Sequence, residues 1–485
     1  MKRKQWGRIV LPIALAASML GGCGMFGSDD TGDNAEPTTL KVMYYDERSF
    51  YDQYGMLFYA LHPEVEIEVV STQSVKWEEG KDMNAAMAAF IDEEQPDIVM
   101  LSTEQYTKLA EEGKLMDLEA RVADKRFEQE GLMPGMLDYL RDLSGGTLYG
   151  LVPDFYSQAL FYNKDLFDKF GVDLPTDKMS WDELFRLAAM FPADGSGEDR
   201  VYGLKLGYSG SDLYQLANMI GMTQNLNIVD AGGTQVTINS DAWKQAFETA
   251  DTALKSGALY VEDPMSSGSG AVSYEEFLLR DPFIGGKAAM TMDGTFIMGQ
   301  IKQAQDVVKD KAIQNWDIVT LPVDPSNPDY SPFINFNNIF AIYAKTAAAD
   351  AAWSFLSYIH SDEFARVTSK RQQGYTSVRT KYAKDDEGHN YAAFYALKPM
   401  QSAMNANYAK LPTDFMMQFM NMTRTKFANV TEGEQRPIAD VLDELQAEAQ
   451  DALTLAIQQR DSSPPPASTS THAAVESTSE AVVGK

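Results

Sequence analysis

The sequence is poor in the residues that build disulfide bonds and transition-metal sites. Its 485 residues include one cysteine and four histidines. A single cysteine excludes a disulfide framework and a cysteine-based zinc cluster. No histidine lies within metal-ligand spacing of another, so a histidine-rich metal site is not expected. We therefore predict neither a metal centre nor a bound cofactor.

Basic residues are also scarce. The chain carries 41 lysines and arginines against 70 aspartates and glutamates, a formal net charge of −29. Such an acidic surface repels phosphate backbones, which argues against a nucleic-acid partner. Hydrophobic residues still make up 44% of the sequence. The composition is that of a globular protein, and the length suffices for two or three domains.

Motifs of common enzyme classes are missing. We find no G-x-S-x-G, no H-E-x-x-H and no P-loop, and the stretch GYSGS at 207–211 lacks the final glycine of the first motif. Acidic runs at 92–94 and 385–387 resemble a pair of glycosidase carboxylates, but runs this polar are usually solvated. We therefore expect a protein that binds without catalysis, with no catalytic residues.

The N-terminal segment has the layout of a secretory signal peptide. Residues 1–8 are basic, residues 9–20 are mostly apolar, and small residues follow. Twelve apolar residues are too few for a membrane-spanning helix, which takes about 20. The run Leu20-Gly21-Gly22-Cys23 resembles the lipobox of bacterial lipoproteins, in which the cysteine receives a diacylglyceryl group. We predict a signal peptide at 1–22, a lipid on Cys23 and a flexible tether at 23–39.

The body begins with alternating strand and helix patterns. Strands are predicted at 40–45, 64–70 and 97–101. Helices are predicted from Ser49, with Asp52 completing a capping box, over 77–92, and from a cap at Ser102 or Thr103 to Gly113. This order is typical of a parallel α/β sheet, whose ligands bind beyond the carboxyl ends of the strands. Residues 44–48 and 102–104 are therefore candidates for the site.

Capping boxes and apolar runs continue to about residue 460. Helices are predicted at 163–170, 181–191, 211–219, 241–257, 348–360 and 436–460, and strands at 148–153, 159–162, 201–206, 288–292, 317–322 and 334–343. No second apolar run approaches transmembrane length. The segment 461–485 is rich in Ser, Thr, Pro and Ala, which predicts a disordered tail.

Five segments, in order along the chain, match motifs of one known protein family. They are YGLVP at 149–153 with LFYNKDLF at 160–167, SWDEL at 180–184, FIGGKAAM at 283–290 with Asp293-Gly294, WDIVTLP at 316–322, and AAWSFL at 351–356. Each match alone is weak. Together they resemble the bacterial extracellular solute-binding proteins that include the maltose-binding and other sugar-binding components of ABC importers.

The resemblance implies an α/β fold of the type II periplasmic-binding-protein kind, with two lobes and several crossovers. Each lobe is expected to be a mainly parallel sheet flanked by helices. By analogy, lobe one covers 40–152 and 335–375, and lobe two covers 153–334 and 376–460. The family closes two lobes on a solute and presents it to a permease of an ABC transporter. We accordingly expect a small-molecule solute, a mono- or oligosaccharide, and attachment to the outer face of the membrane through lipid.

A neutral sugar needs aromatic platforms with carboxylates, amides and arginines at their edges. Residues of these types at predicted strand ends and crossovers are the ligand-binding candidates: Tyr44, Tyr45, Glu47, Arg48, Ser102, Phe155, Tyr156, Asp293, Phe296, Asn335, Asn337 and Tyr375. The family often has a stacking tryptophan where this sequence has Phe296. Phenylalanine lacks the indole N–H.

Four alternatives stay open at this point. Some relatives of the fold bind ferric iron through paired phenolates, but neighbours in a strand, such as Tyr44 and Tyr45, point to opposite faces. The run 324–329 contains acidic residues that suit calcium and two prolines that suit a plain loop. A secreted glycan-active enzyme and a binding protein that signals through a sensor are the other two.

Overall fold

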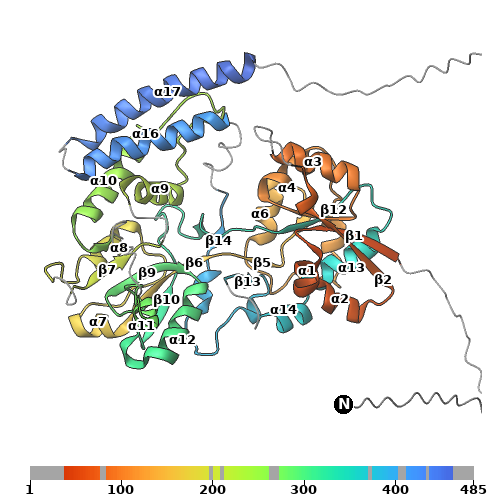
Figure 1. The fold of residues 1–485 in the computed structure, drawn as a ribbon, viewed down its shortest axis with the longest axis horizontal. Coiled ribbons are helices and arrows are strands. Elements are labelled where there is room, and N and C mark those ends of the chain that lie inside the picture. The colour runs from red at the N-terminus through yellow and green to blue at the C-terminus, as the bar shows by residue number, and fades with distance from the viewer. Residues whose placement is uncertain are drawn as a thin grey trace, which may run out of the picture. The chain divides into compact units, whose positions relative to one another are not determined.

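The computed structural model describes residues 38–76, 83–195, 200–207, 212–261, 272–369, 374–401, 411–432 and 436–462. The predicted signal peptide, Cys23, nearly all of the tether and the tail beyond residue 462 lie outside these residues. Within them the chain forms two five-stranded sheets with helices packed around each, together with two short strand pairs (Figure 1). The predicted α/β class is confirmed.

The first sheet is built mainly from the N-terminal part of the chain. Its strands are, in spatial order, β2 (Val65–Ser71), β1 (Thr38–Tyr44), β3 (Ile98–Leu101), β12 (Ile339–Ile342) and β4 (Gly150–Leu151). The pairings among β2, β1 and β3 are parallel, whereas β12 runs antiparallel to β3 and β4. The helices that accompany it are α1 (Glu47–Phe50), α2 (Met56–Leu61), α3 (Met83–Glu94), α4 (Thr103–Glu111), α5 (Glu119–Val122), α6 (Met136–Leu143), α13 (Ala349–Ile359) and α14 (Asp362–Thr368).

Local sequence patterns explain strand β2 and the starts of helices α1 and α4. In β2, Val65 and Ile67 are buried and Glu66 and Glu68 are exposed, as the alternating pattern predicts, whereas Val69 is half-buried and its neighbour Val70 is buried. The predicted cap at Ser102 is confirmed, because Ser102 and Gln105 form a capping box at the start of α4. The cap predicted at Ser49 is wrong. The carboxylate of Asp46 instead accepts the backbone N–H of Ser49, and α1 begins two residues earlier.

The second sheet lies in the middle of the chain. Its strands are, in spatial order, β10 (Trp316–Val319), β6 (Gln158–Asn163), β9 (Ala288–Gly294), β7 (Tyr202–Lys205) and β8 (Leu259–Tyr260). The β10–β6 and β6–β9 pairings are antiparallel, and the β9–β7 and β7–β8 pairings are parallel. Its helices are α7 (Lys164–Phe170), α8 (Trp181–Ala188), α9 (Leu213–Thr223), α10 (Asp241–Lys255), α11 (Tyr274–Leu278), α12 (Phe296–Val308), α16 (Thr413–Glu432) and α17 (Ile438–Ser462).

Both sheets are mixed, although we expected mainly parallel ones. In each sheet, two of the four strand pairings are antiparallel. The antiparallel strand β12 reaches β3 from more than 200 residues further along the chain, a distance at which strand periodicity carries no information on direction. The glycine Gly203 in β7 is needed for packing, since a Cβ there would lie 2.0 Å from the backbone oxygen of Ala188 in α8.

Helices α16 and α17 complete the second core. They lie side by side in Figure 1, next to α9 and α10, and their buried residues include Phe415, Phe419, Leu442 and Leu445. The helix predicted at 436–460 is confirmed as α17, whereas α16 was not predicted. Among the described residues no helix combines the length and the apolar composition needed to cross a membrane, and this includes the 25-residue α17.

Short strand pairs mark where the chain passes between the two sheets. Strand β5 (Asp154–Phe155) pairs antiparallel with β13 (Thr376–Ser377), and β11 (Tyr330–Ser331) pairs parallel with β14 (Lys398–Pro399). Tyr156 and Asn335 exchange backbone hydrogen bonds of 2.9 and 2.8 Å. The chain therefore crosses after β4, before β12 and after α14. The predicted lobe boundaries at 152/153, 334/335 and 375/376 stay a prediction.

Candidate functional site

Two adjacent tyrosines at the end of β1 have opposite environments. Tyr44 is fully buried, its hydroxyl donates to Gln53 Oε1 at 2.7 Å, and its ring packs against those of Phe50 and Tyr54. Burial raises the pKa of its hydroxyl. Tyr45 is 50% exposed. The prediction that Tyr44 faces solute is therefore wrong because the ring belongs to the core, and this opposite placement also disfavours an iron site shared by both phenolates.

The crossover segment that contains β5 alternates in the same way. Asp154, Tyr156 and Gln158 are partly exposed, while Phe155 and Ser157 between them are buried. Phe155 packs on Phe336, with ring centroids 6.4 Å apart, so its predicted contact with solute is also wrong. The side-chain amide of Gln158 donates to the hydroxyl of Tyr156 at 3.2 Å. One face of this segment is therefore polar.

The far end of β9 carries an ion-paired aspartate. Asp293 lies opposite Ala159 of β6, and its Oδ1 accepts the backbone N–H of Gly294 at 2.8 Å. The ammonium nitrogen of Lys205, at the end of β7, lies 3.9 Å from Asp293 Oδ2 and 2.6 Å from Asp281 Oδ2. Burial raises the pKa of the Asp293 carboxyl, and the positive charge of Lys205 partly offsets this effect.

Electrostatic interactions join these separate segments. The pKa of the Tyr45 hydroxyl is raised by burial and by Tyr375. Burial, Asp293 and Tyr375 likewise raise the pKa of the Tyr156 hydroxyl, while the hydrogen bond from Gln158 lowers it. Tyr375, just before β13, is 39% exposed. We call Tyr45, Tyr156, Asp293 and Tyr375 the tyrosine–aspartate cluster. It draws on the ends of β1 and β9 and on both strands of the β5–β13 crossover.

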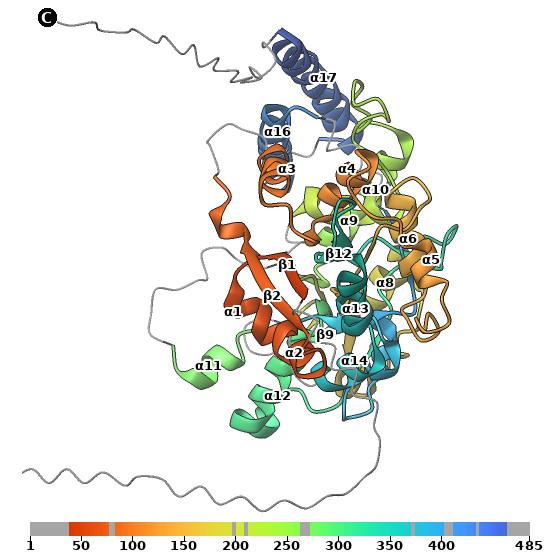
Figure 2. The same cartoon turned by 90° about the vertical axis from the view of Figure 1, so that its right-hand side faces the viewer.

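The remaining candidates are exposed and stay predictions. Glu47 and Arg48 lie in α1, where Arg48 forms a 3.8 Å ion pair with Asp52. Ser102 caps α4, Phe296 begins α12 and is 55% exposed, and Asn335 and Asn337 precede β12. Figures 1 and 2 both show α11 and α12 lying next to each other, and they also contact each other. Phe296 therefore lies on a helix that packs against α11, and not in a strand of the second sheet.

Sequence reasoning missed Asp154. Burial raises the pKa of its carboxyl to about 7. The alternation of the crossover segment contains the signal that would have found it, because Asp154 precedes the candidate Tyr156 by two residues and shares its face. Asp154 also raises the pKa of the Tyr44 and Tyr54 hydroxyls, after the larger effect of burial. It therefore lies close to the end of β1.

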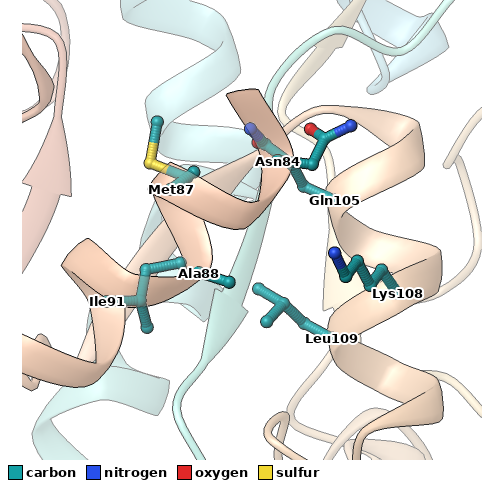
Figure 3. Close-up of a pocket in the computed structure, with 7 residues that line it drawn as sticks. All are labelled: Asn84, Met87, Ala88, Ile91, Gln105, Lys108 and Leu109. Atoms are coloured by element: carbon teal, nitrogen blue, oxygen red, sulfur yellow. The ribbon is translucent and has the colours of Figure 1, made fainter. Parts of the chain in front are cut away.

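A hollow between α3 and α4 does not match the size of a sugar site. It is lined by side chains of these two helices, among them Met87, Ile91 and Leu109 (Figure 3). Its volume of about 10 Å³ is close to the minimum for one water molecule. We assign no function to this hollow.

The described residues do not provide a set of side chains that could bind a metal ion. No group of three His, Cys, Asp or Glu side chains among them is placed to hold an ion. In the loop considered for calcium, Asp324 Oδ2 accepts the hydroxyl of Ser326 at 2.7 Å, and Asp329 forms a 2.5 Å ion pair with Lys178. These contacts fit a plain loop better than a calcium site.

The comparison with known families decides the class of protein. The model of the bacterial extracellular solute-binding protein family matches residues 62–396, which is more than half of the chain. The chain belongs to this family. The sequence-based resemblance is confirmed, and the family is one of binding proteins.

Individual relatives are distant. A binding protein from Brucella abortus (strain 2308) is 24% identical over 396 residues, covering 79% of this chain and 86% of the relative. The sn-glycerol-3-phosphate-binding periplasmic protein UgpB from Rhizobium meliloti (strain 1021) is 24% identical over 180 residues, 36% of this chain and 41% of UgpB. A sugar transporter from Rhizobium etli, solved in an open conformation, has a TM-score of 0.60 at 21% identity, with 86% of this chain and 99% of that chain covered. The structural likeness confirms the two-lobe fold.

Proposed function

We propose that this solute-binding protein captures a mono- or oligosaccharide and delivers it unchanged to the permease of an ABC transporter. The tyrosine–aspartate cluster is the observation that supports this proposal most directly. Two exposed tyrosine rings, Tyr45 and Tyr375, offer apolar faces for the C–H groups of a sugar, and Asp293 and Tyr156 offer polar groups for its hydroxyls. The structural likeness to the Rhizobium etli sugar transporter agrees with this chemistry.

The positions of the cluster residues indicate how solute binding favours a closed form of the protein. The cluster takes Tyr45 from the end of a strand in the first sheet and Asp293 from the end of a strand in the second. A solute that touches both groups binds most tightly when the two sheets approach each other. It therefore increases the population of a closed state, which a permease can distinguish from the open one.

A lipid on Cys23 would hold the protein at the outer face of the membrane. Two or more acyl chains anchor a protein stably, whereas one chain does not. The replacement Cys23→Ser should then release the protein into the medium or periplasm. Retention of the variant in the membrane fraction would contradict the anchor.

A glycan panel tests the binding function. We expect at least one sugar to raise the melting temperature of the full chain without being converted into products. Formation of products from any glycan would instead support the glycan-active enzyme.

Single replacements then test the site. Tyr45→Ala and Tyr375→Ala should each raise the dissociation constant of that sugar about tenfold or more, which corresponds to about 1.4 kcal/mol of lost binding free energy. Tyr59→Ala is the matched control, because Tyr59 is 56% exposed on α2. Unchanged affinity in both site variants would remove these tyrosines from the site.

A further inference from the structure

A second carboxylate, that of Asp154, lies on the polar side of the crossover segment, and it differs from Asp293 in lacking a neighbouring cation among the described residues. Asp293 has Lys205 beside it, at 3.9 Å. For Asp154, burial alone accounts for the raised pKa of the carboxyl, and the described residues place no ion-pair partner next to it. A carboxylate that is partly removed from water without a partner costs free energy, and a cation brought by a ligand offsets that cost.

The placement of Asp154 connects it to the candidate site. Residues two apart in an extended segment share a face, so Asp154 points to the same side as Tyr156, while Phe155 between them is fully buried. Asp154 pairs with Ser377 of β13, two residues after Tyr375, so the strand pairing places the side chains of Asp154 and Tyr375 on one face. Burial and, to a smaller extent, Asp154 raise the pKa of the Tyr44 hydroxyl, which agrees with a position of this carboxylate near the end of β1. Asp154 therefore lies on the same face as two members of the tyrosine–aspartate cluster, Tyr156 and Tyr375.

The surrounding groups favour a positively charged ligand over an anion. Tyr45 and Tyr375 present exposed aromatic rings, and an aromatic face attracts an ammonium group. The carboxyls in this region include Asp46, Asp154, Asp281 and Asp293, and its cations include Lys205, which Asp281 and Asp293 share, and Arg48, which pairs with Asp52. A phosphate ester would bring further negative charge to a region where carboxyls outnumber cations, so the site should reject it.

We propose that the solute presents a primary ammonium group, which pairs with Asp154 while the tyrosine rings pack around it. The inference rests on the proposed function, since it names the chemical class of the solute for that same site. Within that function the solute is an amine-bearing sugar.

Calorimetric titrations of the full-length chain at pH 7, where the amines of the probes are mainly protonated, test the pairing. The probes are glucose, galactose and mannose, their 2-amino and 6-phosphate derivatives, the β-1,4-linked dimers of glucose and glucosamine, and spermidine. We expect an amine-bearing sugar to bind about tenfold or more tightly than its neutral parent. The replacement Asp154→Asn should reduce this ratio to about one. The control Asp350→Asn should leave it unchanged, because Asp350 is 92% exposed and pairs with Arg121 at 2.6 Å.

The other outcomes separate the two proposals. A neutral sugar or sugar phosphate that binds as tightly as the amine would overturn the ammonium inference and leave solute binding intact. Binding of spermidine but of no sugar would support the ammonium pairing and overturn the carbohydrate assignment. An amine preference that persists in Asp154→Asn, in a variant whose thermal unfolding shows a native fold, would refute the role of Asp154. Binding of no probe would count against both proposals.

Discussion

The ends of β1 and β9 contribute different chemistry to the candidate site. Around the end of β1, the rings of Tyr44, Tyr54 and Phe50 pack edge to face, and Tyr45 is left exposed on top of them. At the end of β9, Lys205 joins Asp281 and Asp293 in an ion-paired group. One side therefore offers an exposed aromatic ring that lies on a packed aromatic core, and the other offers ion-paired charged groups. A solute that needs both must contact both sheets.

Tyr44→Ala should have the largest effect on stability, because it removes a buried ring from the aromatic side. We expect the free energy of unfolding to fall by about 3–5 kcal/mol, as for other large-to-alanine changes in a core. Tyr45→Ala is the matched neighbour and should change stability by less than about 0.5 kcal/mol. Denaturant unfolding of both variants measures the difference. Equal losses would contradict the opposite burial of the two rings.

Lys205→Met tests the ionic side. It leaves the carboxylates of Asp281 and Asp293 without their shared cation, so we expect a loss of about 2 kcal/mol, below the 3–5 kcal/mol seen for fully buried pairs. The control is Lys255→Met, whose 2.7 Å pair with Asp251 involves a lysine side chain that is 68% exposed. Its loss should stay below about 1 kcal/mol. Thermal unfolding at one pH gives both values, and a greater loss in the control would refute the assigned importance of the ionic group.

Asp154→Asn should make stability less dependent on pH. Folding raises the pKa of this carboxyl from 3.8 to about 7, so the folded state holds the proton more tightly than the unfolded state. In the wild type this group therefore lowers stability as pH rises from about 4 to 7, and the loss is complete above pH 7. The full shift corresponds to about 4 kcal/mol, but Asp154 is partly exposed, so the variant should gain on the order of 1–2 kcal/mol over wild type at pH 8 and almost nothing at pH 4. Urea titrations at the two pH values measure the gain.

A gain of equal size at pH 4 and pH 8 would show that the carboxyl of Asp154 does not titrate in this range. Other carboxyls, such as Asp92 and Glu119, have lowered pKa values in the folded state and act in the opposite direction. Their contributions are common to the wild type and the variant. The difference between the two proteins therefore isolates Asp154.

Arg48→Ala should have the smallest effect. The guanidinium is 92% exposed and lies 3.8 Å from Asp52, so the pair is screened by water and salt. We expect stability to change by less than about 0.5 kcal/mol, whereas the affinity for solute falls only if Arg48 is the ligand-binding residue that the sequence predicts. Calorimetry and thermal unfolding check these values. A large loss of affinity would extend the site from Tyr45 into α1.

Local sequence signals were sufficient for most of the helices and strands. The helices predicted at 163–170 and 181–191 are confirmed as α7 and α8, which begin after caps at Asn163 and Ser180. The error at Ser49 arose because Asp46, three residues earlier, also suits a cap, and sequence spacing did not distinguish them. Strand direction in the two sheets depends on contacts between distant segments, which local periodicity does not contain.

The candidate site was predicted less completely. The alternation rule correctly separated the two sides of β1, but it did not say which of the two tyrosines faces the core. The same rule, applied to the crossover, would have added Asp154 and removed Phe155. Lys205 contacts Asp281 and Asp293, which lie 76 and 88 positions further along the chain. The parallel pairing of β7 with β9 brings Lys205 to Asp293, and no motif predicts either contact.

A crystal structure of the chain with its tightest-binding sugar tests the central claim most directly. The account predicts that one sugar ring contacts Tyr45 or Tyr375 and that a polar group of the same molecule lies within hydrogen-bond distance of Asp293 or Tyr156. A sugar held by residues of one sheet alone, with the four side chains of the cluster untouched, would contradict it.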